Sequence, residues 1–182
     1  MATERKLCSD ARHERTVEEE IVALMDRFET PIYNYLLSIL RDHDLALDCA
    51  QDTFLRAYEA LCKRKRINGS WLYTVARNRA VDEFRHRRRV QTDGGLLQET
   101  LTAKGAAETA LEVQTILARL PRTDREVLYL FQIAGFATEE IGAMLGIRGS
   151  AVRQRLMRAR QRFRALYCAD SGETSKPEAT SF

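Results

Sequence analysis

Apolar residues recur at intervals of three and four along most of this chain, which is the spacing of helices that are buried along one side. The clearest case is the segment from Ile147 to Tyr167, where Val152, Leu156 and Ala159 lead the apolar stripe. The same segment carries seven arginines and no acidic residue. No stretch shows the alternating pattern of a half-buried strand, so the sequence predicts an all-α protein.

A short helix and a tight turn are expected directly before that basic segment. Residues 138–145 have helical spacing, and Gly146 and Ile147 follow them. A short helix, a glycine turn and a basic amphipathic helix are typical of a helix-turn-helix motif, whose second helix enters the major groove of DNA. The side of this second helix that should face solvent carries Arg153, Gln154, Met157, Arg158, Gln161 and Arg164.

Two further helices are expected in the first part of the chain. The first has an apolar face over residues 18–29, after which Thr30 can cap a new or kinked turn with Pro31 at its first position. The second spans residues 44–61, and its apolar side is predicted to hold Leu47, Ala50, Phe54, Ala57, Tyr58 and Leu61. Its adjacent face carries Asp44, Asp48, Gln51, Asp52, Leu55 and Glu59. That acidic face suits either solvent or the docking of a basic protein surface.

A third helix is predicted for residues 71–88, with Ser70 as its N-cap. The basic run 63–66 and the turn signal Asn68-Gly69 precede it. Its core side is expected to hold Trp71, Leu72, Val75 and Ala76. Tyr73, Val81 and Phe84 lie elsewhere on the helix, and they suit either a second packed side or a surface that stacks single-stranded nucleic acid.

Glycines and a loss of periodicity over residues 90–107 indicate a flexible linker between two small helical domains. Helices resume from about residue 108, and Pro121 should begin one that Gly135 closes. The predicted organisation is therefore a disordered N-terminus (1–17), a helical domain (18–89), the linker (90–107), a helix-turn-helix domain (108–167) and a disordered tail (168–182).

Charge is distributed unevenly, although the formal net charge of the 182 residues is only +3. From Glu14 to Ala60 there are eleven acidic and four basic residues, whereas from Cys62 to Arg89 there are ten basic and two acidic ones. Because phosphate is attracted to basic segments, charge favours nucleic acid as the partner of the second segment. The acidic segment suits a basic protein partner instead.

No apolar run approaches the length of a membrane span, and residues 1–15 lack an apolar signal core, so a cytoplasmic location is expected. The four cysteines have no paired spacing and should be free thiols there. No Ser/His/Asp arrangement or phosphate loop is present, so no catalysis is predicted. No cofactor or metal is predicted either, with a site built on Cys8 and His13 as a weak alternative.

Two segments carry a resemblance to a known family. Residues 48–58 (DCAQDTFLRAY) and 71–82 (WLYTVARNRAVD) resemble region 2 of bacterial sigma factors. Five shorter segments resemble region 4 of the same proteins: LP at 120–121, REVL at 125–128, EEIG at 139–142, LGI at 145–147 and VRQRL at 152–156. The absence of anything large between the two is similar to the extracytoplasmic-function (ECF) group, so the chain is identified as resembling that group from about residue 18 to 167.

This resemblance implies an alternative sigma factor that binds core RNA polymerase, recognises the −35 and −10 promoter elements and helps to open the DNA. The implied partners are the clamp helices of the largest polymerase subunit, the flap of the second-largest subunit, promoter DNA and an anti-sigma factor. The free protein is expected to be a monomer.

The resemblance also assigns residues to each contact. Core-polymerase binding falls on Asp48, Gln51, Asp52 and Arg56. Recognition and melting of the −10 element fall on Lys63, Arg64, Lys65, Arg66, Asn68, Trp71, Arg77, Asn78, Asp82, Arg85 and Arg88. Reading of the −35 element falls on Arg148, Ser150, Arg153, Gln154, Met157 and Arg158.

The chain departs from the family pattern at two helix starts, where Ala137 and Arg148 stand in place of the usual serine caps, and at Ala151, where threonine is common. These changes bear on the pose of the DNA. The main alternative function is a helix-turn-helix regulator that acts without polymerase, which would leave the acidic face and the third helix unexplained. A further possibility adds redox control through Cys62, which precedes four cations.

Overall fold

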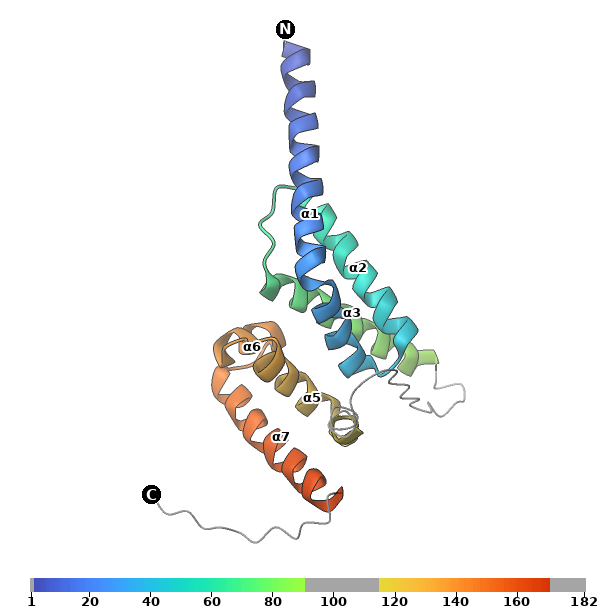
Figure 1. The fold of residues 1–182 in the computed structure, drawn as a ribbon, viewed down its shortest axis with the longest axis vertical. Coiled ribbons are helices and arrows are strands. Elements are labelled where there is room, and N and C mark those ends of the chain that lie inside the picture. Colours follow the sequence, from blue (N-terminus) through green and yellow to red (C-terminus); the bar gives the residue numbers. More distant parts are fainter. Residues whose placement is uncertain (1, 91–114, 171–182) are drawn as a thin grey trace. The chain divides into compact units, whose positions relative to one another are not determined.

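The computed structural model describes residues 2–90 and 115–170, and within them the side chains of residues 15–87 and 115–169. Every regular element of these residues is helical, which confirms the predicted all-α class (Figure 1). The chain divides into two compact units, Met1–Leu101 and Thr102–Phe182. The predicted linker (90–107) lies almost wholly outside the described residues. The domain boundaries and the disorder predicted for residues 1–17 and for the tail remain predictions.

The first unit is a bundle of three helices, α1 (Ala2–Leu40), α2 (His43–Cys62) and α3 (Gly69–Val90), which lie side by side in Figure 1. Alanines on the inner sides of α2 and α3 let the helices approach closely, and larger side chains from α1 fill the space between them. The rings of Tyr35 and Tyr73 meet edge to face at the centre, with centroids 5.1 Å apart. The buried residues include Ile32, Tyr35, Leu36, Ile39, Ala46, Ala50, Ala57, Leu72, Tyr73, Ala76 and Ala80.

Helix α1 runs without a break through Pro31, so no new helix begins at Thr30, and the alternative of a kinked turn there stays a prediction. Pro31 removes one backbone hydrogen bond. Ile32, Leu36 and Ile39 nevertheless bury the same side of the helix in the bundle, and this packing offsets the loss. The helix ends at a tight turn in which Arg41 takes the left-handed conformation, with φ of 57°.

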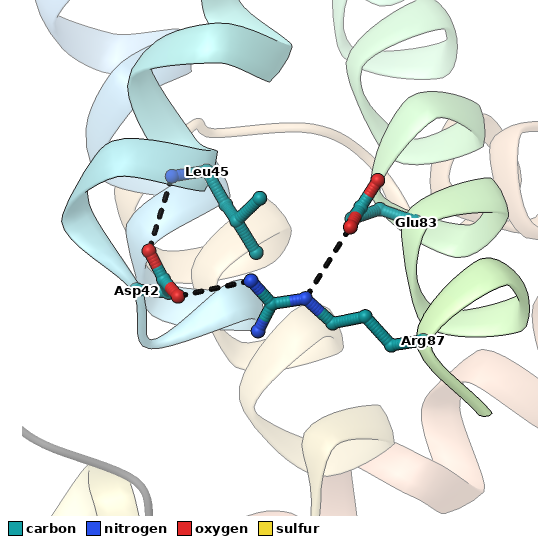
Figure 2. A network of polar contacts seen from close by, with 4 residues as sticks. All are labelled: Asp42, Leu45, Glu83 and Arg87. Carbon is teal, nitrogen blue, oxygen red and sulfur yellow. Dashed lines mark hydrogen bonds and ion pairs between the residues drawn. The ribbon is translucent and has the colours of Figure 1, made fainter. Parts of the chain in front are cut away.

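The Asp42 side chain contacts both the start of α2 and the end of α3 (Figure 2). Its Oδ1 accepts a hydrogen bond from the backbone N–H of Leu45 at 3.1 Å, which caps the start of α2. Its Oδ2 lies 3.1 Å from Nη2 of Arg87, near the end of α3, and Nε of Arg87 donates to Glu83 at 3.3 Å. The turn between α1 and α2 is therefore held against the last turns of α3.

The second unit contains α5 (Arg122–Leu128), η2 (Tyr129–Ile133), α6 (Thr138–Leu145) and α7 (Gly149–Asp170), preceded by helical residues 115–119. Pro121 stands at the N-cap of α5, as the sequence predicts. The helix then widens into a π-turn, in which the N–H of Ala134 donates to Tyr129 O. The core of the unit gathers Val127, Leu130, Ile141, Val152, Leu156 and Ala159.

Two glycines shape the turn between α6 and α7. Gly146 has φ of 67°, a left-handed conformation that suits glycine at the end of a helix. A Cβ on Gly142 would lie 2.7 Å from Ile147 O, so only glycine lets the turn pack against α6. The short helix, glycine turn and long helix predicted from the sequence are thus present with nearly the predicted bounds.

Candidate functional site

The exposed side of α7 carries the predicted −35 residues. Arg153, Gln154, Met157 and Arg158 are all exposed, and Met157 exposes 56% of its surface although it is apolar. Arg148 and Ser150 are exposed just before them. The opposite side of α7 is buried through Val152, Leu156 and Ala159, as the periodicity predicts. The fold therefore presents these six residues together on one surface, and their contact with DNA remains a prediction.

Arg153 is not a free cation on that surface. Its Nη1 donates to Oε1 of Glu139 in α6 at 2.7 Å and lies 3.4 Å from Oγ1 of Thr138. Oε2 of Glu139 accepts a hydrogen bond from Thr138 Oγ1 at 2.9 Å. Sequence reasoning missed Glu139, because residues fourteen apart on different helices share no periodic signal.

The starts of α6 and α7 carry Ala137 and Arg148 where the family usually has serine caps. At α6 the backbone N–H of Ala137 donates to Oε2 of Glu140 at 2.8 Å, which is one half of a capping box. At α7 the carbonyl of Arg148 accepts from the N–H groups of Ala151 and Val152, and the Arg148 side chain stays exposed. Arg148 is therefore available for a phosphate.

Two buried polar residues hold α5 in place beneath α7. The guanidinium of Arg125 donates to the carbonyls of Ala118 and Leu120, at 2.8 and 2.9 Å, and so closes the end of the preceding helix. Arg162 of α7 forms an ion pair with the buried Asp124 of α5. Arg162 therefore joins α7 to α5, whereas Arg153 joins α7 to α6 at the exposed surface.

A pocket opens along α7 next to the predicted reading surface. Its apolar floor is formed by Phe131 and Leu156, and the guanidinium of Arg160 lies 5.3 Å from the centre of the Phe131 ring. Arg153, Arg160 and Arg164 line its rim. An apolar floor with a basic rim suits an apolar side chain from an acidic protein segment.

Helix α2 exposes an apolar stripe among its acidic residues. Leu47, Leu55 and Tyr58 expose 44%, 62% and 43% of their surfaces, and Gln51 lies between them at helical spacing. The prediction that Leu47 and Tyr58 face the core is wrong. The reason is that four of the eight buried residues of α2 are alanines, and helical spacing places both Leu47 and Tyr58 at the margin of this buried side.

The predicted polymerase-binding residues divide on this helix. Asp48, Gln51 and Arg56 are exposed. Asp52 is partly exposed and pairs with Arg79 of α3, with 2.7 Å between Oδ2 and Nη2. The Asp52 carboxylate therefore links α2 to α3 within the protein, and the pairing with Arg79 partly neutralises the charge that a binding partner would meet.

The loop between α2 and α3 carries the predicted basic run. Lys63, Arg64, Lys65 and Arg66 are all exposed, and Arg64 has φ of 56°. Asn68 caps α3, because its Oδ1 accepts a hydrogen bond from the N–H of Trp71 at 2.8 Å. The prediction of Ser70 as the N-cap is wrong, because α3 begins at Gly69, two residues before the predicted start at Trp71. The Asn68 side chain therefore shapes the loop.

A Cβ on Gly69 would lie 3.0 Å from the Phe28 ring, so the start of α3 packs directly against α1. Of the four predicted core residues, Leu72 and Ala76 are buried, whereas Trp71 and Val75 are half-buried. Trp71 therefore stands at the border between the core and the surface that follows the basic loop.

Helical spacing places Trp71, Asn78, Asp82 and Arg85 on one side of α3. Asn78, Asp82 and Arg85 are exposed, and Asp82 lies 3.6 Å from Arg85. Arg77 is half-buried on a neighbouring side, and the Arg88 side chain lies outside the described part of the chain. Tyr73 is buried in the bundle rather than available for stacking.

Other chemistry is sparse in the described residues. Burial raises the pKa of the Cys49 thiol, and Cys62 is exposed at the end of α2. Among the residues that the structure describes, no group of three His, Cys, Asp or Glu side chains could hold a metal ion, and the side chains of Cys8 and His13 lie outside that part. No helix of the described residues is long and apolar enough to span a membrane.

The sequence matches two known families, one in each unit. Sigma-70 region 2 matches residues 24–90, and Sigma-70, region 4 matches residues 110–163. The ECF RNA polymerase sigma factor EcfG of Rhodopseudomonas palustris is 30% identical over 152 residues, covering 80% of this chain and 84% of that protein. SigM of Bacillus subtilis, also an ECF RNA polymerase sigma factor, is 33% identical over 143 residues, covering 75% and 88%.

A solved structure has the same fold. It is the sigma factor RpoE in complex with the anti-sigma factor NepR from Bartonella quintana. The TM-score is 0.74 at 24% sequence identity, and the match covers 84% of this chain and 99% of that one. The two-unit helical architecture is therefore one that a known protein adopts over its whole length.

Proposed function

The chain belongs to the extracytoplasmic-function group of sigma-70 factors, and we propose from this membership that it binds core RNA polymerase and directs it to promoters with matching −35 and −10 elements. The observation that carries the proposal is the presence of regions 2 and 4, in that order, on one short chain. A stand-alone regulator would need only the helix-turn-helix, so region 2 argues against that alternative.

Sigma factors are transcription-initiation factors rather than catalysts. We propose that this chain likewise has no catalytic residues and needs no cofactor, and that it works in the cytoplasm, where polymerase and DNA are found. The free protein is proposed to be a monomer.

Polymerase docking is assigned to the exposed stripe of α2. Leu47, Leu55 and Tyr58 supply apolar area, and Asp48 with Gln51 supplies polar groups beside it. An apolar centre with a polar rim is the usual anatomy of a protein interface. The clamp helices of the largest polymerase subunit are the proposed occupant.

The −10 element is assigned to the basic loop and α3. Lys63 to Arg66 lie directly before a helix whose exposed side carries Trp71, Asn78 and Arg85. Opening DNA requires unstacked bases to be held, and cations beside an accessible aromatic ring supply both phosphate contacts and a stacking surface. Asn68 contributes through the cap that fixes the loop, since its side chain already accepts the Trp71 N–H.

The −35 element is assigned to α7, where Arg153, Gln154 and Arg158 can reach base edges, while Arg148 and Ser150 suit phosphates. The pocket floored by Phe131 and Leu156 is proposed to receive an apolar side chain of the polymerase flap. An anti-sigma factor is proposed as the partner that keeps the protein inactive, by analogy with RpoE, whose structure contains one.

Transcript sequencing after overexpression tests this function. The expected result is a small set of new transcript starts that share one sequence near −35 and one near −10. The variant Asp48→Lys with Leu55→Glu is the control, because it should keep the helix-turn-helix intact and lose every new start. New starts that persist in this variant would favour the stand-alone regulator.

A further inference from the structure

The first turn of α6 brings a carboxylate against the recognition helix α7. Oε1 of Glu139 lies 2.7 Å from Nη1 of Arg153, and Oε2 accepts the hydroxyl of Thr138 at 2.9 Å. The side chains of Arg153 and Glu139 expose 59% and 69% of their surfaces. The pair therefore stands on the surface that the helix-turn-helix presents, and it is not part of the core.

The start of α7 lies close to this carboxylate. A Cβ on Gly149, the first residue of α7, would lie 2.9 Å from Oε1 of Glu139. This oxygen is the far end of an exposed side chain, so it could shift to make room for a side chain at position 149. The position beside the first turn of a helix also favours a negative charge.

Glu139 is ionised at neutral pH. Hydrogen bonds from the Thr138 hydroxyl, from its own backbone N–H and from Arg153 hold the pKa of this carboxyl below its ordinary value. A carboxylate that faces DNA repels phosphate and so weakens DNA binding. A useful function of Glu139 at this surface would offset that loss.

We propose that Glu139 is a positioning residue for promoter choice: it holds Arg153 in the orientation that reads one base of the −35 element. The inference rests on the proposed function. A free arginine samples many rotamers and loses that freedom when it contacts a base. A partner that restricts the side chain beforehand therefore lowers the entropy lost on binding the base. The guanidinium has five N–H donors, and one given to Glu139 leaves others for the O6 and N7 of guanine.

The same pair suppresses sequence-independent binding. An unpaired cation attracts the phosphates of any sequence, whereas Arg153 beside Glu139 is locally neutralised. Loss of Glu139 should therefore raise affinity for DNA in general but lower sequence preference. Binding to every sequence becomes tighter and more sensitive to salt, and the preference for one base at the position read by Arg153 falls.

The test uses full-length protein with core polymerase and a promoter library randomised in the −35 element, with the transcripts sequenced. Arg153→Ala identifies the position that Arg153 reads. Glu139→Ala should lower base preference at that same position by roughly fivefold or more and leave the other positions unchanged. Glu139→Asp, which keeps the charge, should restore most of the preference.

Glu140→Ala is the matched control. It removes the same charge one residue away and also removes the hydrogen bond to the Ala137 N–H, so a merely structural effect would appear there at least as strongly. Unchanged base preference in Glu139→Ala, or an equal loss in Glu140→Ala, would overturn the positioning role while wild-type protein still selects a promoter. A wild-type protein that selects no sequence would overturn the proposed function, and the inference with it.

Discussion

Nη2 of Arg87 lies 3.1 Å from Oδ2 of Asp42, which joins residues forty-five apart in sequence and ties the start of α2 to the end of α3 (Figure 2). Asp42 also caps α2 through the N–H of Leu45. Burial opposes the charge of Asp42, but the Leu45 N–H and the Arg87 guanidinium together hold its pKa below the ordinary value. One carboxylate thus serves a helix cap and a contact between helices.

Asp42→Ala should lower the free energy of unfolding of the first unit by about 1–2 kcal/mol, because it removes the cap and leaves Arg87 without this partner. Arg87→Ala should cost less, about 0.5–1 kcal/mol, because the pair is partly exposed and the cap remains. Denaturant unfolding followed by the fluorescence of Trp71, the single tryptophan of the chain, reports on this unit. Equal losses in the two variants would contradict the double role of Asp42.

Alkaline pH should destabilise the first unit through Tyr73. Burial raises the pKa of Tyr73 to about 12 in the folded protein. The unfolded chain ionises this residue at pH ~10. The stability that neutral, buried Tyr73 gives to the folded protein is therefore fully present below that pH, and it is lost as the pH rises toward the folded pKa. Tyr73→Phe should remove a loss on the order of 2 kcal/mol over that range, as measured by denaturant midpoints. Tyr58→Phe, at an exposed tyrosine, should keep the wild-type profile.

Leu55→Glu should weaken binding to core polymerase by at least roughly tenfold, because it places a charge in the centre of the proposed apolar stripe. Leu55 exposes 62% of its surface, so the substitution should leave folding unchanged by circular dichroism. Val22→Glu is the matched control, since Val22 is also an exposed apolar residue, on α1. Titration of labelled protein with core polymerase measures both, and equal effects would remove the docking assignment from α2.

Reversal of both Asp48 and Asp52 to lysine should abolish polymerase binding. The structure adds that the second change also breaks the pair with Arg79. Asp48→Lys alone is therefore the cleaner variant, and Asp52→Lys should show an additional loss of stability in the unfolding assay.

Arg158→Ala should cost about 1–3 kcal/mol on the preferred −35 sequence and relax the preference at one position, if Arg158 reads a base. Competition binding against −35 variants measures this. Arg164→Ala removes the same charge from an exposed site further along α7 and should leave base preference unchanged. A uniform loss on all sequences for Arg158→Ala would mean that this residue contacts phosphate only.

Local sequence patterns were sufficient to place a helix or turn where one residue type decides its geometry. Gly146 ends α6 in the left-handed conformation, and Val152, Leu156 and Ala159 bury one side of α7, so the helix-turn-helix could be placed from sequence. Helix α2 was harder, because apolar residues occur on several of its sides. Periodicity could not show that Leu47 and Tyr58 fall at the margin of the buried side of α2.

Contacts between helices left no signal in the sequence. Asp52 with Arg79 and Glu139 with Arg153 are pairs set by how two helices pack, and a residue-by-residue reading treats each partner as free. The N-cap of α3 was misassigned because Asn68 and Ser70 are both good caps, and in the structure the oxygen Oδ1 of Asn68 accepts the Trp71 N–H.

Run-off transcription with purified components tests the central claim most directly. Full-length protein, core polymerase and a template with a promoter found by transcript sequencing are combined, with core polymerase alone as the control. The account predicts a single run-off product that requires the protein and is lost when either the −35 or the −10 element is scrambled. Specific binding of the protein to that template with no transcript would contradict it.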